Sequence, residues 1–466
     1  MNYEMLSRYR AALMGLAMLF VMFFHVPMAK GELMYGLVRL GNIGVDMFLF
    51  LSGIGLWFSW TKSVSRYENR ETRYEVRGTR YENQRSAPTG KANSNEGQAS
   101  APDGNLVPRT SHLAPRKKHL ASLLKEFYRK RLLRIYPAWI IIACLYYIPD
   151  FFGTDLFGQF DYATGADWHS TKSPNVLHLI GNILVNWSFW RIDDGAFWFI
   201  PSILAMYVFA PFYMELIRRH PVYRWMPVVA MVWAVMVQYM PPIHEAVGHI
   251  EIFWSRIPIF LIGINCGELV KQKKPIEPSV LWLLLITFGL SLLMCIEFEN
   301  HWRGHFPLFL ERMVYIPLCI SCMLLVCKFF SGYEVRGTRY ENSFSGCEVR
   351  GASYENGFSR YEVRGARCEN QRSAPTGKAN SDRGQTSELE GNLVPRTPHL
   401  VPRIIIRSLT FIGGISLEIY LVHAQFVLRY LTPLKLGYCL TVVLLIAISL
   451  PLAWLLKRLT NLIMDN

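Results

Sequence analysis

The amino-acid sequence predicts an all-α fold, that of a polytopic integral membrane protein with about ten transmembrane helices. Of its 466 residues, 51% are hydrophobic and 14% are aromatic, whereas only 18% are charged. A soluble chain of this length normally carries more charge. The net charge of +14 does not require a nucleic-acid partner, because membrane proteins gather Lys and Arg in their cytoplasmic loops.

Apolar windows of about 20 residues, long enough to cross about 30 Å of hydrocarbon, recur along the chain. In order they lie near residues 10–29, 36–60, 135–152, 196–217, 222–240, 252–270, 279–297, 308–330, 404–428 and 436–457. The first follows a basic region but is longer than the apolar core of a signal peptide, so we expect a retained helix. Residues 176–190 are apolar but short, and they contain Asn182 and Asn186. We interpret this segment as re-entrant or interfacial.

The distribution of basic residues predicts the orientation. With ten spans, the clusters at 8–10, 129–134, 218–219, 271–274 and 457–458 all fall on one side of the membrane. By the positive-inside rule that side is the cytoplasm, so both termini are expected there.

Two polar segments, 61–118 and 331–403, interrupt the membrane pattern and resemble each other. The stretch that begins QRSAPTGKANS at Gln84 recurs at Gln371, and both copies follow repeated RYEVRG-like units. These units have too few aliphatic residues to bury a core, so we predict disordered cytoplasmic insertions. They divide the membrane domain into 1–60, 119–330 and 404–466. An arm that binds nucleic acid or anionic lipid is the alternative, because Arg and Tyr alternate, but no nucleic-acid partner is expected.

Ionisable residues inside the apolar segments are the main indication of chemistry. His25 ends the first segment, Asp46 interrupts the second, and Glu418 lies in the middle of a late one. A carboxylate at the centre of a bilayer-spanning helix costs about 2.5–3.5 kcal/mol on insertion scales, so such residues usually face a polar cavity. Imidazole suits general-base catalysis near neutral pH. A structural or interfacial histidine, and an acid that only satisfies a neighbouring donor, remain the alternatives.

Further candidates lie near the predicted membrane surfaces. Arg131 and Arg134 are three residues apart, on one helix face, where they could bind a phosphate; positive-inside anchoring explains them equally well. His423, near the outer boundary, could contact substrate. The outer segment IHEAVGHIE (from His244) has one residue too many for the zinc motif H-E-x-x-H. HWRGH (from His301) has its histidines at i, i+4, but in a loop rich in Pro and Gly, and the C-x-x-C of Cys319 and Cys322 has no second pair. We expect no bound metal or cofactor.

The ordered set of segments resembles the acyltransferase 3 family of membrane acyltransferases, which acylate surface polysaccharides and lipids. The matching pieces are the first segment with His25, then 41–53 (GNIGVDMFLFLSG), 130–139 (KRLLRIYPAW), 198–212 (WFIPSILAMYVFAPF), 260–269 (FLIGINCGEL) and 415–427 (ISLEIYLVHAQFV). The resemblance implies that His25 is essential and that Arg131 and Arg134 contact acyl-CoA. The family commonly has an arginine eleven positions before that histidine, where this chain has Met14. Arg10 lies one helical turn earlier.

The resemblance therefore implies a membrane O-acyltransferase of the bacterial inner membrane. It would move an acyl group, expected to be acetyl, from cytoplasmic acetyl-CoA, a co-substrate, to a hydroxyl of a cell-envelope carbohydrate or glycolipid. His25, Asp46 and Glu418 are the catalytic candidates, Arg131 and Arg134 would bind the donor, and His423 and Trp198 would bind substrate. A transporter or flippase for a polyprenyl-linked sugar, or an inactive relative, is the alternative.

Overall fold

The computed structural model describes residues 2–85, 115–154, 159–160, 167–168, 175–192, 197–302, 308–344 and 400–465. The chain divides into two units: Met1–Ser331 together with Ile404–Asn466, and Gly332–Arg403. The described residues of the second unit are the last turns of one helix and the first residues of another. All that follows concerns the first unit.

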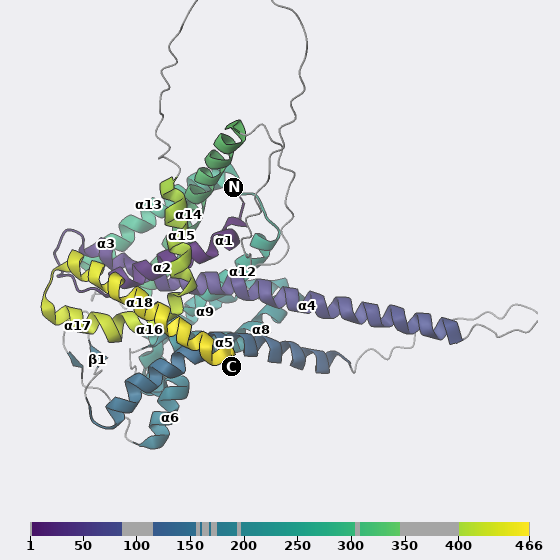
Figure 1. Cartoon of the computed structure of the whole chain (residues 1–466), viewed down its shortest axis with the longest axis horizontal. Coiled ribbons are helices and arrows are strands. Elements are labelled where there is room, and N and C mark those ends of the chain that lie inside the picture. Colours follow the sequence, from purple (N-terminus) through teal and green to yellow (C-terminus); the bar gives the residue numbers. More distant parts are fainter. Residues whose placement is uncertain are drawn as a thin grey trace, which may run out of the picture. The chain divides into compact units, whose positions relative to one another are not determined.

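The described residues are almost entirely helical (Figure 1), as the sequence predicted. The first half contains α1 (Met5–Arg8), α2 (Arg10–His25), α3 (Tyr35–Arg39), η1 (Leu40–Asn42), α4 (Ile43–Arg85), α5 (Pro115–Phe151), the paired two-residue strands β1 (Gln159–Phe160) and β2 (Asp167–Trp168), α6 (Val176–Val185), α7 (Trp187–Ile192), α8 (Phe199–Arg219), η3 (Pro221–Trp225) and α9 (Met226–Tyr239). The second half contains α10 (Pro241–Val247), η4 (Gly248–Ile250), α11 (Glu251–Trp254), α12 (Ile257–Lys271), α13 (Pro278–Glu297), η5 (Phe298–Trp302), α14 (Leu308–Phe344), α15 (Leu400–Gly414), α16 (Ser416–Val422), η6 (His423–Leu428), α17 (Arg429–Leu431), η7 (Thr432–Leu434) and α18 (Tyr438–Asp465).

Six of the described helices are long and apolar enough to cross a membrane, and the number rises to eight if each of two bent helix pairs counts as one span. The chain is an integral membrane protein by this criterion, but the predicted count of ten is not confirmed. One reason is that α2 has only 16 residues, fewer than the about 20 that a perpendicular span needs. The segment predicted to be re-entrant forms two short helices, α6 and α7.

The insertions differ in part from the prediction of disorder. Helix α4 continues from the membrane domain to Arg85, α5 starts at Pro115, and α14 extends to Phe344. The repeat units are rich in Arg and Glu, which have high helix propensity. Adding residues to an existing helix avoids the cost of nucleation, so the helices extend past the apolar boundary. Residues 86–114 and 345–399 of the predicted insertions lie outside the described residues.

Glycines let the central helices approach one another closely. A Cβ atom on Gly15 of α2 would overlap the carbonyl oxygen of Leu409 in α15, and one on Gly413 would overlap that of Ala11. Gly53 of α4 and Gly263 of α12 meet each other's helix in the same way. Small residues give this kind of backbone contact in membrane helix bundles. Helix α2, which carries His25, is therefore fixed firmly within the bundle.

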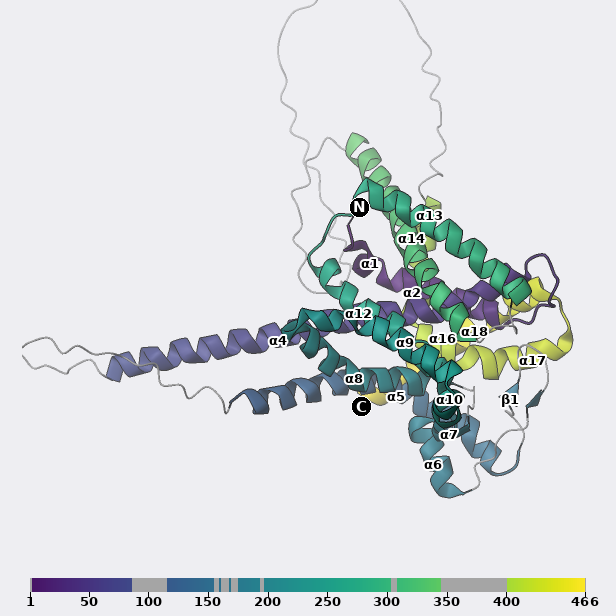
Figure 2. The same ribbon diagram turned by 180° about the vertical axis from the view of Figure 1, so that it is seen from behind.

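The two ends of the chain meet at α2. Helix α16 and the π-helical turn η6 pack against α2, and α18 packs against all three; the same neighbourhood is visible from both sides in Figures 1 and 2. The α15–α16 pair is bent by 64° at a break after Gly414. Turns of π-helix within helices often mark functional sites, and this one begins at His423.

Candidate active site

His25 and His423 lie together although 398 residues separate them. Nδ1 of His25 is 3.3 Å from Nε2 of His423, and the ring centroids are 5.0 Å apart. His423 is only 1% exposed. Two residues predicted separately, one as catalytic and one as substrate-binding, therefore form one pair.

The hydrogen bonds of the pair assign the ring protons. Nδ1 of His423 lies 3.0 Å and 2.9 Å from the carbonyl oxygens of Ile419 and Tyr420, so it carries the proton and donates to them. Nε2 of His423 is then an acceptor. Nδ1 of His25 donates to the carbonyl oxygen of Val21, at 2.7 Å, and toward Nε2 of His423. In the neutral ring this leaves the lone pair of His25 on Nε2, the form that a general base needs.

A pocket runs along α2 toward this pair. It has a volume of about 720 Å³, including the open space at its mouth. Its walls come from α2, α4, α5, α8 and α16: Arg10, Met14, Val21, Val45, Phe48, Ser52, Arg134, Ile135, Phe199, Ile203, Tyr207, Ser416, Leu417 and Tyr420. A mostly apolar pocket wall with a few converging polar groups is typical of a small-molecule site.

Two arginines stand at one end of the pocket, which we call the arginine end. Arg134 is exposed and Arg10 is partly buried, and both belong to the pocket wall together with Tyr207. Met14, which replaces the family's arginine, also lines the pocket, one helical turn from Arg10. Arg10 thus supplies a cation from the same helix as Met14.

Arg131 lies beside the arginine end rather than within it. Its guanidinium stacks on the ring of Phe127, 4.4 Å from the centroid. It lines a separate pocket between α5, α6 and α8, and the two pockets share Tyr207. The structure therefore places only Arg134 of the predicted pair in the main pocket wall.

The other end of the pocket, which we call the histidine end, approaches the pair. Val21 lines the pocket and its carbonyl oxygen accepts the bond from His25. Tyr420 lines it too, with its ring centroid 6.0 Å from that of His423. Arg10 and Val21 are eleven residues apart on α2, which at 1.5 Å per residue corresponds to about 16 Å. One pocket therefore extends from two cations to within one helical turn of His25.

Asp46, one of the predicted catalytic residues, lies outside the pocket wall. It forms a buried ion pair with Arg256 of the α11–α12 junction, and Arg256 also donates to the side-chain oxygen of Asn42, at 2.8 Å. Asp46 and Arg256 are each 1% exposed. This ion pair joins α4 to α12 and does not line the pocket. Sequence reasoning missed Arg256, although a cation inside the apolar run 250–265 could have been found by the argument that found Asp46.

Glu418 and Trp198 also lie outside the pocket wall. The carboxylate of Glu418 accepts a hydrogen bond from Lys457 of α18, at 2.9 Å, and this ion pair joins α16 to α18. Trp198 is the residue before α8, whereas its neighbour Phe199 lines the pocket. Neither residue therefore contributes a side chain to the pocket wall.

No metal site appears in the part of the chain that the structure describes, where no three His, Cys, Asp or Glu side chains come together suitably. His249 bonds the carbonyl oxygen of Trp190, and His301 pairs with Glu297. His305 lies outside the described residues.

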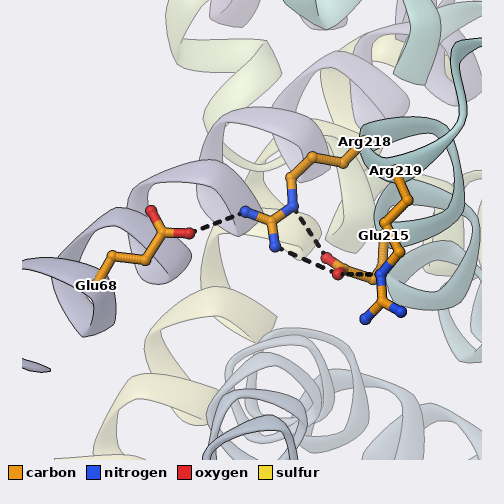
Figure 3. Close-up of polar contacts among 4 residues, drawn as sticks. All are labelled: Glu68, Glu215, Arg218 and Arg219. Carbon is orange, nitrogen blue, oxygen red and sulfur yellow. Dashed lines mark hydrogen bonds and ion pairs between the residues drawn. The ribbon is translucent and has the colours of Figure 1, made fainter. Parts of the chain in front are cut away.

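A polar cluster at the end of α8 is exposed, in contrast to the buried ion pair of Asp46 and Arg256 (Figure 3). Arg218 bonds Glu68 of α4 at 3.0 Å and Glu215 at 3.1 Å, and Arg219 bonds Glu215 at 2.8 Å. Glu68, Arg218 and Arg219 have side chains that are 60%, 38% and 57% exposed. Exposed pairs of this kind contribute little to stability.

The fold and this pocket define an integral membrane protein with a pair of adjoining histidines, and comparison with known families makes the class specific. Residues 120–336 match the family model described as an acyltransferase domain. This match confirms the resemblance to the acyltransferase 3 family seen in the sequence. The matched range contains Arg134, Phe199 and Arg256, whereas His25 and His423 lie outside it. No curated protein and no solved structure matched the chain.

Proposed function

We propose that the protein is an O-acyltransferase that takes an acetyl group from acetyl-CoA and passes it to a hydroxyl of a cell-envelope carbohydrate or lipid-linked glycan. The observation that carries this proposal is the single pocket with arginines at one end and, at the other, Val21 and Tyr420, whose carbonyl oxygens accept hydrogen bonds from the histidine pair. The match of residues 120–336 to the family model supports the transferase class.

The arginine end suits the donor. Coenzyme A carries phosphates on a long, thin pantetheine arm that ends in the thioester. Guanidinium groups bind phosphate through charge-assisted hydrogen bonds, and Arg10 and Arg134 stand at the pocket mouth. We place the arginine end at the cytoplasmic face of a bacterial inner membrane, where acetyl-CoA is made. The arm would then follow the apolar wall toward the histidines.

The histidine end suits the reaction. Nε2 of His25 takes the proton from the acceptor hydroxyl, and the hydroxyl oxygen attacks the thioester carbonyl carbon. The carbon–sulfur bond breaks, coenzyme A leaves as the thiol after receiving a proton from His25, and an ester remains on the acceptor. His423 is a positioning residue, because its Nε2 holds the Nδ1–H of His25. A covalent acyl-histidine on the same atom gives the same products in two steps.

The experiment is transfer of label from radiolabelled acetyl-CoA into envelope glycans and glycolipids. Three membranes are compared, containing the native protein, His25→Ala or an empty vector. The proposal predicts label that depends on the native protein and is lost in His25→Ala at equal protein level. Label that persists in His25→Ala would exclude His25 as the base, and its absence from native membranes supplied with envelope acceptors would reject acetyl-CoA as donor.

A further inference from the structure

A row of aromatic rings bounds the histidine end of the pocket. The ring centroids of Phe48 and Phe199 are 6.3 Å apart, and those of Phe199 and Tyr420 are 5.3 Å apart. Tyr420 is 6.0 Å from His423, which stacks edge-on against His25. Phe48, Phe199 and Tyr420, which we call the aromatic row, come from α4, α8 and α16, and all three line the pocket.

The row is held in place rather than loosely packed. The hydroxyl oxygen of Tyr420 accepts a hydrogen bond from the backbone N–H of Phe199, at 3.2 Å. Phe199 is the first residue of α8, so this bond satisfies a donor that the helix leaves unpaired. The ring of Tyr420 and the start of α8 therefore move together. A wall fixed in this way can discriminate by size.

On the basis of the proposed function, we infer that the aromatic row is the acyl-length gauge of the enzyme and restricts the donor to short acyl groups. For the thioester carbonyl to reach the histidine pair, the rest of the acyl chain must occupy the same end of the pocket. The three rings and the side chains of Val21 and Val45 line that end. An acetyl methyl group fits beside them, whereas each further methylene must displace a ring.

Phe199 is the position to test, because removing its ring opens the row without touching either histidine. The helix offers a matched control in Phe209, which is ten residues further along α8 and 66% exposed. Phe199→Ala and Phe209→Ala delete the same side chain from the same helix, one at the pocket and one at the lipid-facing surface. Phe48→Ala opens the row from another helix.

The measurement is kcat/KM for acetyl-, butanoyl- and octanoyl-CoA with each variant, expressed as the ratio of the longer donor to acetyl. Size discrimination in an apolar pocket amounts to about 10–200-fold per methylene. We therefore expect Phe199→Ala to raise the octanoyl-to-acetyl ratio by at least about 10-fold, and Phe48→Ala to raise it in the same direction. Phe209→Ala should keep the native ratio. Because the readout is a ratio within one preparation, lower expression of a variant does not affect it.

An unchanged ratio in both Phe199→Ala and Phe48→Ala, with acetyl transfer retained, would overturn the inference and leave the proposed function intact. Native protein that uses octanoyl-CoA as well as acetyl-CoA would also overturn it. If the native protein transfers from none of the three donors, the proposed function itself fails. If Phe199→Ala does not accumulate in membranes, Phe199→Leu opens less space, and the same ratio decides the question.

Discussion

The two ends of the pocket are built differently. The arginine end uses long side chains near a surface, and Arg134 there is exposed. The histidine end adjoins two imidazole rings, one buried and one partly buried, whose protons are assigned by backbone carbonyl oxygens. A flexible cation can hold a charged group at varied positions, whereas a base must be fixed to within about 0.5 Å of its working geometry. This difference indicates that donor binding and reaction are separated along one pocket. Substitutions at the arginine end should therefore change KM, whereas substitutions at the histidine end should change kcat.

The largest effect is expected at His25. Replacing His25 by Gln should lower kcat by about 10²–10⁴-fold, the usual contribution of a general base, with little change in the KM for acetyl-CoA. The measurement is acetyl transfer over a range of donor concentrations. A large rise in KM with unchanged kcat would place His25 in donor binding and break the distinction between the two ends.

The scaffold behind the histidine end should be the next most sensitive. Arg256→Met leaves the buried carboxylate of Asp46 without its cation, and removal of one partner of a buried pair costs about 3–5 kcal/mol. Thermal unfolding in detergent should therefore occur at a clearly lower temperature. The double variant Asp46→Leu with Arg256→Met removes both charges and should recover most of the loss. A double variant as unstable as the single one would show that packing, not the lone charge, is responsible.

A smaller effect is expected at the arginine end. Arg134→Gln should raise the KM for acetyl-CoA about 10-fold, because a hydrogen bond to a charged group is worth about 1.5–3 kcal/mol, and should leave kcat near the native value. Arg129→Gln is the matched control, since Arg129 is exposed on the same helix and does not line the pocket. An equal rise in both variants would indicate a general electrostatic effect rather than a site.

The smallest effect concerns the exposed cluster of Figure 3. Arg218→Ala removes its bonds to Glu68 and Glu215, but exposed pairs contribute about 0.2–1 kcal/mol. We expect a shift in unfolding temperature much smaller than that of Arg256→Met, and no change in acetyl transfer. A shift as large as that of Arg256→Met would mean that burial does not determine how much these ion pairs contribute to stability.

The cost of burying ionisable groups predicted one residue of the site and two residues that lie outside the pocket wall. That argument found His25, Asp46 and Glu418, and applied consistently it would have found Arg256. It could not assign partners, because the contacts of Asp46 with Arg256 and of Glu418 with Lys457 depend on helix packing. The contact between His25 and His423 could not be predicted from the sequence, because it depends on the break after Gly414 and on the packing of α16 against α2. The lengths of α4 and α14 were misjudged because composition indicates disorder but not how far a helix extends past its apolar part.

The most direct test of the account measures binding and transfer separately in the same preparations. Purified native protein, His25→Gln and Arg134→Gln are titrated with coenzyme A, and acetyl transfer is then measured in membranes at saturating acetyl-CoA. The account predicts that His25→Gln binds coenzyme A like the native protein but does not transfer, whereas Arg134→Gln binds more weakly but transfers at nearly the native rate once saturated. Equal loss of binding in both variants, or transfer by His25→Gln at the native rate, would contradict the separation of a donor-binding end from a reacting end.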